Sequence, residues 1–118
     1  MRIIVKTKGG DLDQKVRDYA TEKFVKLSKL VEEPAVCEIM IFDAFGFKGG
    51  EDKFVEVALT MANEKNPIHV EAKSIDFLAS IDFAHDCLEK QLVKHKEKKK
   101  IGDRFPKKYF DKTNENIS

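Results

Sequence analysis

The sequence predicts an α+β fold, a two-layer sandwich in which a four-stranded mixed sheet carries two helices on one face. Four short segments alternate apolar and polar residues with a period of two, as strands do when one face of their sheet is buried. Two longer segments repeat apolar residues at spacings of three and four, as amphipathic helices do. The segments follow the order β-α-β-β-β-α. Because each helix has a single apolar stripe, both helices are expected on the same face of the sheet.

The N-terminal part of the chain contains the first strand and the first helix. Residues 2–7 alternate as a short strand and are followed by two glycines. The helix is expected from about Leu12 to Val31, with an aspartate just before or within its first turn as the cap. Pro34 marks its end, since proline disfavours helical geometry in the residue before it.

Three further strands are expected at residues 35–43, 53–61 and 68–73, where period-two alternation places apolar side chains on one side. A right-handed crossover through the first helix makes the first two strands parallel neighbours. The short polar connections between the later strands predict an antiparallel meander.

The second helix is expected to begin after Ser74 as its cap, with Asp76 in its first turn. Gly102 and Pro106 mark the region by which it must have ended. Its inward stripe is predicted to consist of Leu78, Ile81, His85, Leu88 and Leu92. Beyond Leu92 the pattern becomes nearly continuous lysine, so the end of this helix is expected to project from the domain.

Length and composition indicate one soluble domain. The chain has 118 residues, of which 42% are hydrophobic and 36% are charged. We expect an α+β domain over residues 1–100, followed by a flexible C-terminal tail over 101–118. No apolar run approaches the roughly 18 residues that span a bilayer, and Met1 leads directly into a strand. The expected location is therefore cytoplasmic, without a membrane partner.

Chemistry-bearing residues do not form a recognisable catalytic pattern. Cys37 and Cys87 are interpreted as small apolar residues, because neither belongs to a CxxC or Cys/His cluster. His69, His85 and His95 lack metal-ligand spacing, and no phosphate loop or nucleophile motif is present. We expect no enzyme activity, catalytic residue, metal, cofactor or small-molecule substrate.

The lysine-rich end of the second helix is the strongest functional signal. Net charge is only +1, from 22 Lys and Arg against 21 Asp and Glu, but residues 90–112 are strongly basic. Lys90, Lys94 and Lys98 fall on one helical stripe. The first helix adds a basic flank, made of Lys15, Lys23, Lys26 and Lys29. A solvated helix face is the plain alternative, but two basic helices on one sheet face favour a groove for a folded RNA backbone.

The second helix also resembles a known family. Residues 74–100, and above all the ending QLVKHKEK at 91–98, closely resemble the ribosome hibernation-promoting factors, the bacterial family of stationary-phase translation inhibitors. The segment KFVKL at 23–27 and the order of elements along residues 1–100 are similar too.

The resemblance implies ribosome hibernation as a stress response. It implies binding to ribosomal RNA of the small ribosomal subunit, in the channel between head and body, where the protein blocks messenger and transfer RNA by occupying space. By position, the residues that would contact rRNA are Lys23, Lys26, Lys90, Lys94, His95, Lys96 and Lys98.

Two alternatives come from other classes of protein. A double-stranded RNA-binding domain also sets two helices on one sheet face, but it reads RNA with lysines at the start of its second helix, where this chain has Asp76 and Asp82. A protein-interaction module would use the open face of the sheet, which is unusually apolar. The residues of that face are Ile4, Met40, Phe42, Phe54 and Ala58.

Overall fold

The structure is a computed structural model that describes residues 1–8, 10–45, 50–62 and 64–104, with side chains as far as Glu97. The described chain forms, in order, β1 (Arg2–Thr7), α1 (Gln14–Val25), the 3-10 helix η1 (Lys26–Leu30), β2 (Ala35–Asp43), β3 (Lys53–Met61), β4 (Ile68–Ser74) and α2 (Phe77–Arg104).

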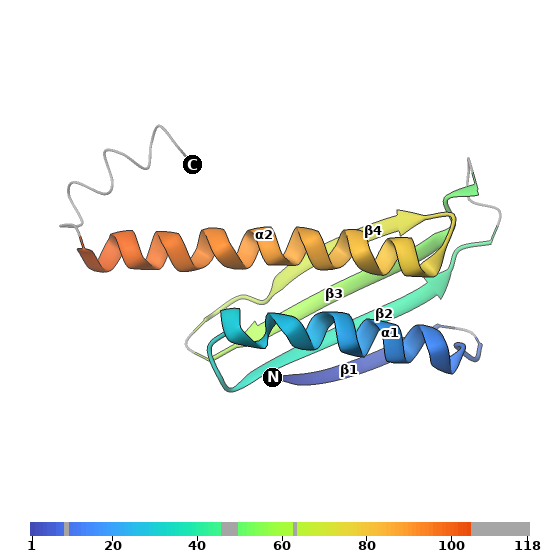
Figure 1. Ribbon diagram of the computed structural model, residues 1–118, viewed down its shortest axis with the longest axis horizontal. Helices are drawn as coiled ribbons and strands as arrows, with labels where there is room; N and C mark the ends of the chain where they lie inside the picture. The colour runs from blue at the N-terminus through green and yellow to red at the C-terminus, as the bar shows by residue number, and fades with distance from the viewer. Residues whose placement is uncertain (9, 46–49, 63, 105–118) are drawn as a thin grey trace.

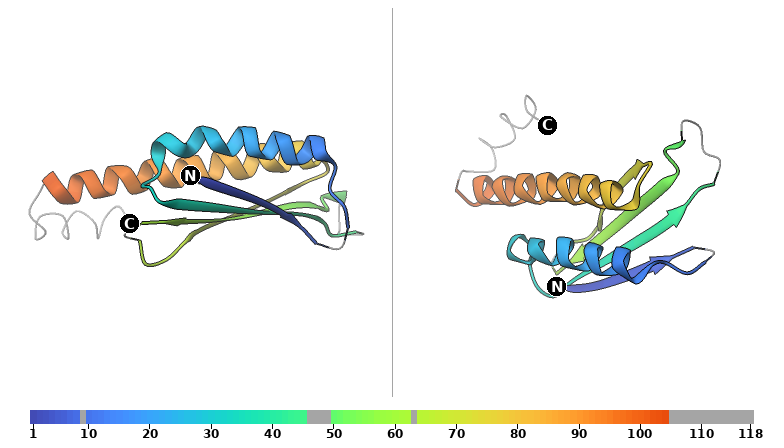
Figure 2. Two further views of the ribbon diagram at one scale, coloured as in Figure 1. Left: turned by 90° about the horizontal axis from the view of Figure 1, so that it is seen from below. Right: turned by 45° about the vertical axis from the view of Figure 1, so that its right-hand side comes forward.

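The four strands form one sheet in the order β1-β2-β3-β4. β1 pairs with β2 in parallel, whereas β2–β3 and β3–β4 are antiparallel. Both helices lie on the same face of this sheet and run side by side, as the two views of Figure 2 show. The predicted α+β sandwich, its mixed sheet and its helical layer are thereby confirmed, and so are the bounds of the first three strands.

The core lies between the sheet and the helices. Alternate residues of β2 and β3 point into it, so Ile39, Ile41 and Val55 are completely buried. The helices contribute the other side, with Phe24 from α1 and Leu88 from α2 also at 0% exposure. Burial of one face only is what the period-two and period-3.6 patterns require.

The first helix is shorter than predicted. α1 ends at Val25, and the chain continues as the 3-10 helix η1 instead of extending to Val31 as an α-helix. The Ser28 hydroxyl donates a hydrogen bond of 2.7 Å to the Val25 carbonyl, and a hydrogen bond of this kind competes with the α-helical ladder. Asp13 is the cap, since its carboxylate accepts a hydrogen bond from the backbone N–H of Lys15 at 3.0 Å.

The second helix begins later than predicted. Ser74 is not its cap but the buried last residue of β4. Asp76 takes the capping position, because its carboxylate accepts from the Leu78 N–H at 3.4 Å and its carbonyl accepts from the Ser80 N–H at 3.0 Å. This shift turns the predicted inward Leu78 outward, to 41% exposure, while Phe77 packs against the core.

The far end of α2 extends past the sheet, as the sequence predicts (Figure 1). The helix runs through Gly102 to Arg104, a few residues beyond the stretch from 74 to 100 that carries the family resemblance. Residues 105–118, most of the expected tail, lie outside the described residues. Of the two cysteines interpreted as small apolar residues, Cys37 is buried in the core, whereas Cys87 is exposed on α2.

Candidate nucleic-acid interface

The candidate interface is the outer side of the helical layer, where α1 and η1 lie next to α2 (Figure 1). Two contacts fix the helices together. The Tyr19 hydroxyl of α1 donates a 2.6 Å hydrogen bond to the Asp82 carboxylate of α2, and the ring of Phe24 meets the edge of His85 at 5.8 Å between centroids. The side chains on this layer therefore keep a fixed spacing across the two helices.

Lys23 is held between the helices. Its ammonium nitrogen lies 3.3 Å from the Asp82 carboxylate, and its side chain is 29% exposed. The pKa of Lys23 is raised, chiefly by this carboxylate, and the same carboxylate raises the pKa of Tyr19 by accepting its hydrogen bond. Lys23 therefore stays positively charged at neutral pH, with an ion-pair partner beside it.

A second carboxylate, that of Asp86, is influenced by the charges of both Lys23 and Lys90. Asp86 lies one turn beyond Asp82, and its carboxylate is 3.0 Å from the Nδ1 atom of His85. The hydrogen bond with His85 lowers the pKa of Asp86, and the charges of Lys23 and Lys90 act in the same direction. The charges of two predicted rRNA contacts, one from each helix, thus act on a single carboxylate.

Further along the layer, Lys29 of η1 and Lys96 of α2 line the same cavity of about 200 Å³. The ring of His95 also lines it, but its Nε2 atom lies 2.7 Å from the Glu64 carboxylate in the β3–β4 connection. The side chain of Lys96 is exposed to solvent. The side chain of His95 is half-buried and lies against that connection.

The remaining predicted contacts are spread along the helices. Lys26 and Lys94 are exposed, and neither is in a described ion pair. The backbone of Lys98 belongs to α2, but its side chain lies outside the described side chains. Lys15 is in the first turn of α1, more than two turns before Lys23, so the four basic residues of the first helical segment form a row and do not meet at one point.

From the sequence, Asp82 is only an acidic residue near the start of the second helix, and neither Asp82 nor Asp86 is placed in the interface between the helices. Asp82 and Asp86 are one turn apart, so they share one side of α2. The completely buried Ile81 shows which side of α2 faces the core. Its neighbour Asp82 lies about 100° around the helix from it, on the side toward α1. The spacing of the two aspartates was a readable signal, but only their contacts with Tyr19 and Lys23 show that they face the basic helix.

One group of described side chains has ligand atoms close enough together for a metal ion. His85, Asp86 and Glu89 offer atoms within 4.8 Å of one another. His85 and Asp86 already form a hydrogen bond with each other, and the charges of Lys23 and Lys90 act on Asp86. These interactions explain the group as a polar cluster without a metal ion.

Among the described residues, no helix is both long enough and apolar enough to span a membrane.

Comparison with known proteins bears on the same residues. The model of a family described as "Sigma 54 modulation protein / S30EA ribosomal protein" matches residues 3–100. No curated protein sequence matches the chain. Solved structures that share its fold include the following two. A ribosomal subunit interface protein from Coxiella burnetii is 20% identical with a TM-score of 0.65, and the alignment covers 82% of this chain and 99% of that one. The N-terminal domain of Thermus thermophilus Protein Y is 21% identical with a TM-score of 0.64, over 80% of this chain and 99% of that one.

Proposed function

Since the chain belongs to the Sigma 54 modulation protein / S30EA ribosomal protein family, which confirms the resemblance to hibernation-promoting factors, we propose that it is a translation inhibitor that binds rRNA of the small ribosomal subunit. In this proposal the helical layer faces the RNA and the domain blocks the channel for messenger and transfer RNA. Inhibition then needs no chemical step. The protein acts in the cytoplasm, where ribosomes are.

The observation that carries the proposal is the common placement of lysines from two helices. Lys23 pairs with Asp82 of α2, and Lys90 lies about two turns beyond Asp82 on the same helix. Lys29 and Lys96 line one cavity, so cations from both helical segments lie on one layer. A folded RNA presents phosphates over a broad surface, and such a surface is matched by cations fixed at several points on a rigid support. Lys26, Lys94 and Lys98 would extend the contact along the same layer.

His95 has a different part in this proposal. Its Nε2 atom lies 2.7 Å from the Glu64 carboxylate without hydrogen-bond geometry, so this close approach places the ring against the β3–β4 connection. That connection supports α2 at the point where the helix leaves the sheet. We infer that His95 positions Lys94 and Lys96 on either side of it and contacts RNA with the exposed part of its ring.

The family match favours this function over the double-stranded RNA-binding alternative. In that alternative the start of the second helix reads the duplex, but here the start is capped by Asp76 and followed by Asp82 in an interhelical contact. Binding to free duplex RNA is therefore expected to be weak. Tight, sequence-independent binding to a duplex would favour the alternative.

The direct test is the triple variant Lys90→Ala, Lys94→Ala, Lys98→Ala. We expect it to fold normally but to lose co-sedimentation with small ribosomal subunits and to stop inhibiting translation in a reconstituted extract. The control, Lys8→Ala with Lys73→Ala, removes two exposed lysines from the opposite side of the sheet and should keep both properties. Undiminished binding by the triple variant would defeat the proposal.

A further inference from the structure

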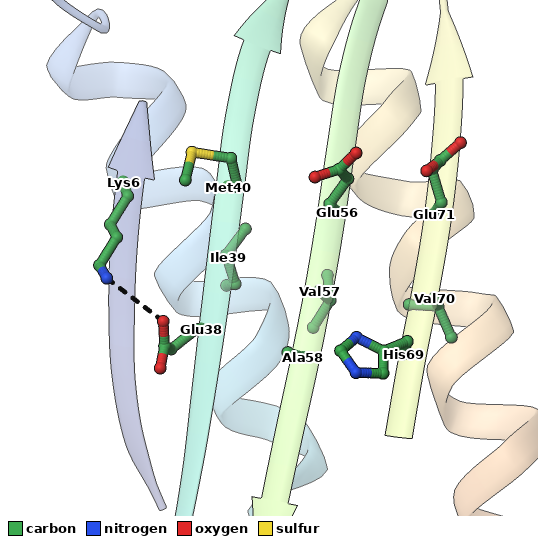
Figure 3. A pocket seen from close by; sticks show the side chains of 10 residues that line it. All are labelled: Lys6, Glu38, Ile39, Met40, Glu56, Val57, Ala58, His69, Val70 and Glu71. Carbon is green, nitrogen blue, oxygen red and sulfur yellow. Dashed lines mark hydrogen bonds and ion pairs between the residues drawn. The ribbon is translucent and has the colours of Figure 1, made fainter. Parts of the chain in front are cut away.

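The face of the sheet that the helices leave open has a hollow at its centre. The hollow has a volume of about 340 Å³ and is lined from all four strands. Figure 3 shows its side chains from the open side. In the strand register, Lys6, Met40, Glu56 and Glu71 form one row across the sheet. The hollow therefore combines an apolar centre with charged side chains.

Two of these charges have no partner among the residues that the structure describes. Glu56 of β3 and Glu71 of β4 are directly opposite each other in an antiparallel pair, and Figure 3 shows both carboxylates on the open side. Like charges in this position repel each other and destabilise a sheet. Glu38, on the other side of the hollow, is neutralised by Lys6 at 3.3 Å. Among the described residues, neither Glu56 nor Glu71 has such an ion pair or a side-chain hydrogen bond.

The same face already accommodates cationic side chains. Lys6 lies along it to reach Glu38 (Figure 3), and the ammonium of Lys8 lies 4.4 Å from the ring centroid of Phe42. Phe42 itself stacks on Phe54 at 5.3 Å between centroids. A lysine or arginine needs apolar surface for its methylene stem and an acceptor for its head. The hollow offers both, with Met40 for the stem and the glutamate pair for the head.

The charge of the hollow also distinguishes the possible occupants. RNA phosphates are repelled by the glutamates that line the hollow, so the hollow does not suit the partner proposed for the helical layer. A protein segment that presents lysine or arginine in an extended conformation is complementary to it in charge and shape. The two faces of the domain would then bind chemically different partners.

We propose that the open face of the sheet is a docking site for a cationic protein segment, with a lysine or arginine head between Glu56 and Glu71. The bound cation replaces the repulsion of the two carboxylates by two charge-assisted contacts. This site is separate from the rRNA contacts of the helical layer and does not depend on them.

The test uses a fluorescent peptide of alternating lysine and threonine as the probe, titrated with the full chain at low salt and followed by anisotropy. The variant Glu56→Gln with Glu71→Gln keeps the shape of the hollow but removes its charge, and we expect it to weaken binding about tenfold. The control, Glu22→Gln with Glu51→Gln, removes the same charge from exposed positions outside the hollow and should change binding less than about twofold.

Equal weakening by both variants would show that the peptide follows net charge alone, and would overturn the proposal. So would the absence of saturable binding to the parent protein up to roughly 1 mM, the range of a very weak contact. Stronger binding of an RNA oligonucleotide than of the peptide at this face, strengthened further when the glutamates are neutralised, would replace the protein partner by RNA. Urea unfolding measures the stability of the Glu56→Gln, Glu71→Gln variant. Its free energy of unfolding should equal or exceed that of the parent, because a repulsive pair has been removed. Ribosome binding by the lysine variants above tests the other proposal separately.

Discussion

Asp82 offers a gain-of-binding test of the helical layer. Its carboxylate accepts the 2.6 Å hydrogen bond from Tyr19 and lies 3.3 Å from the Lys23 ammonium. The substitution Asp82→Asn retains an oxygen that can accept from Tyr19, but it removes the negative charge. Lys23 then loses its competing partner, and the layer becomes more positive at a place where we expect an rRNA phosphate.

The size of the effect follows from the geometry. A phosphate in contact with Lys23 at about 3 Å would lie on the order of 6 Å from the Asp82 carboxylate, because the ammonium stands between them. In bulk water, the repulsion between two unit charges at that distance corresponds to about a threefold change in Kd, and a lower effective dielectric at a protein surface increases it. We therefore expect the Asp82→Asn variant to bind small subunits at least about threefold more tightly.

The assay is an equilibrium titration of labelled protein with purified small subunits at fixed salt. Glu51→Gln is the matched control, because Glu51 is exposed close to the start of β3, at the other end of α2 from its lysine-rich part. It should leave the Kd unchanged. The Lys23→Ala variant should bind more weakly than the parent. Unchanged or weaker binding by Asp82→Asn would refute the placement of a phosphate beside Lys23.

Three further predictions concern the folded domain. The variant Leu88→Ala removes a completely buried side chain and should lower the free energy of unfolding by about 2–5 kcal/mol in a urea titration, whereas a loss below about 1 kcal/mol would contradict the assigned core. Burial raises the pKa of the Cys37 thiol to about 12, so a maleimide should label only the exposed Cys87 in the native protein and reach Cys37 after unfolding, as mass spectrometry can show. Because the folded state lowers the pKa of Asp86, this group stabilises the fold above the ordinary aspartate value of 3.8 and loses that contribution as the pH falls through its folded pKa. The variant Asp86→Asn should therefore show a smaller loss of stability between neutral and acidic pH than the parent, and an identical acid dependence would contradict the contact with His85.

Most of the fold could be predicted from local patterns. The strands 2–7, 35–43 and 53–61 have the predicted bounds, because alternation ends where a turn residue or a polar loop begins. The end of α1 could not be predicted in the same way. Leu27 and Leu30 are three residues apart, a spacing that suits a 3-10 helix as well as an α-helix.

The candidate site was predictable in its composition but not in its pairing. Runs of lysine identify a basic surface, and the amphipathic stripes place it on the outer side of both helices. The contacts of Lys23 with Asp82 and of His95 with Glu64 join residues that are far apart in the sequence. No local pattern specifies which acid a lysine or histidine will meet, since the relative position of two helices is set by their packing.

The salt dependence of binding to the small subunit tests the central claim most directly. Each phosphate contact steepens the log–log slope of affinity against salt by about 0.7 to 0.9, so removing Lys90 and Lys94 should flatten the slope by roughly 1.4 to 1.8. Removing Lys8 and Lys73 from the open side should leave the slope of the parent. Equal slopes for all three proteins would contradict the assignment of the helical layer as the rRNA-binding surface.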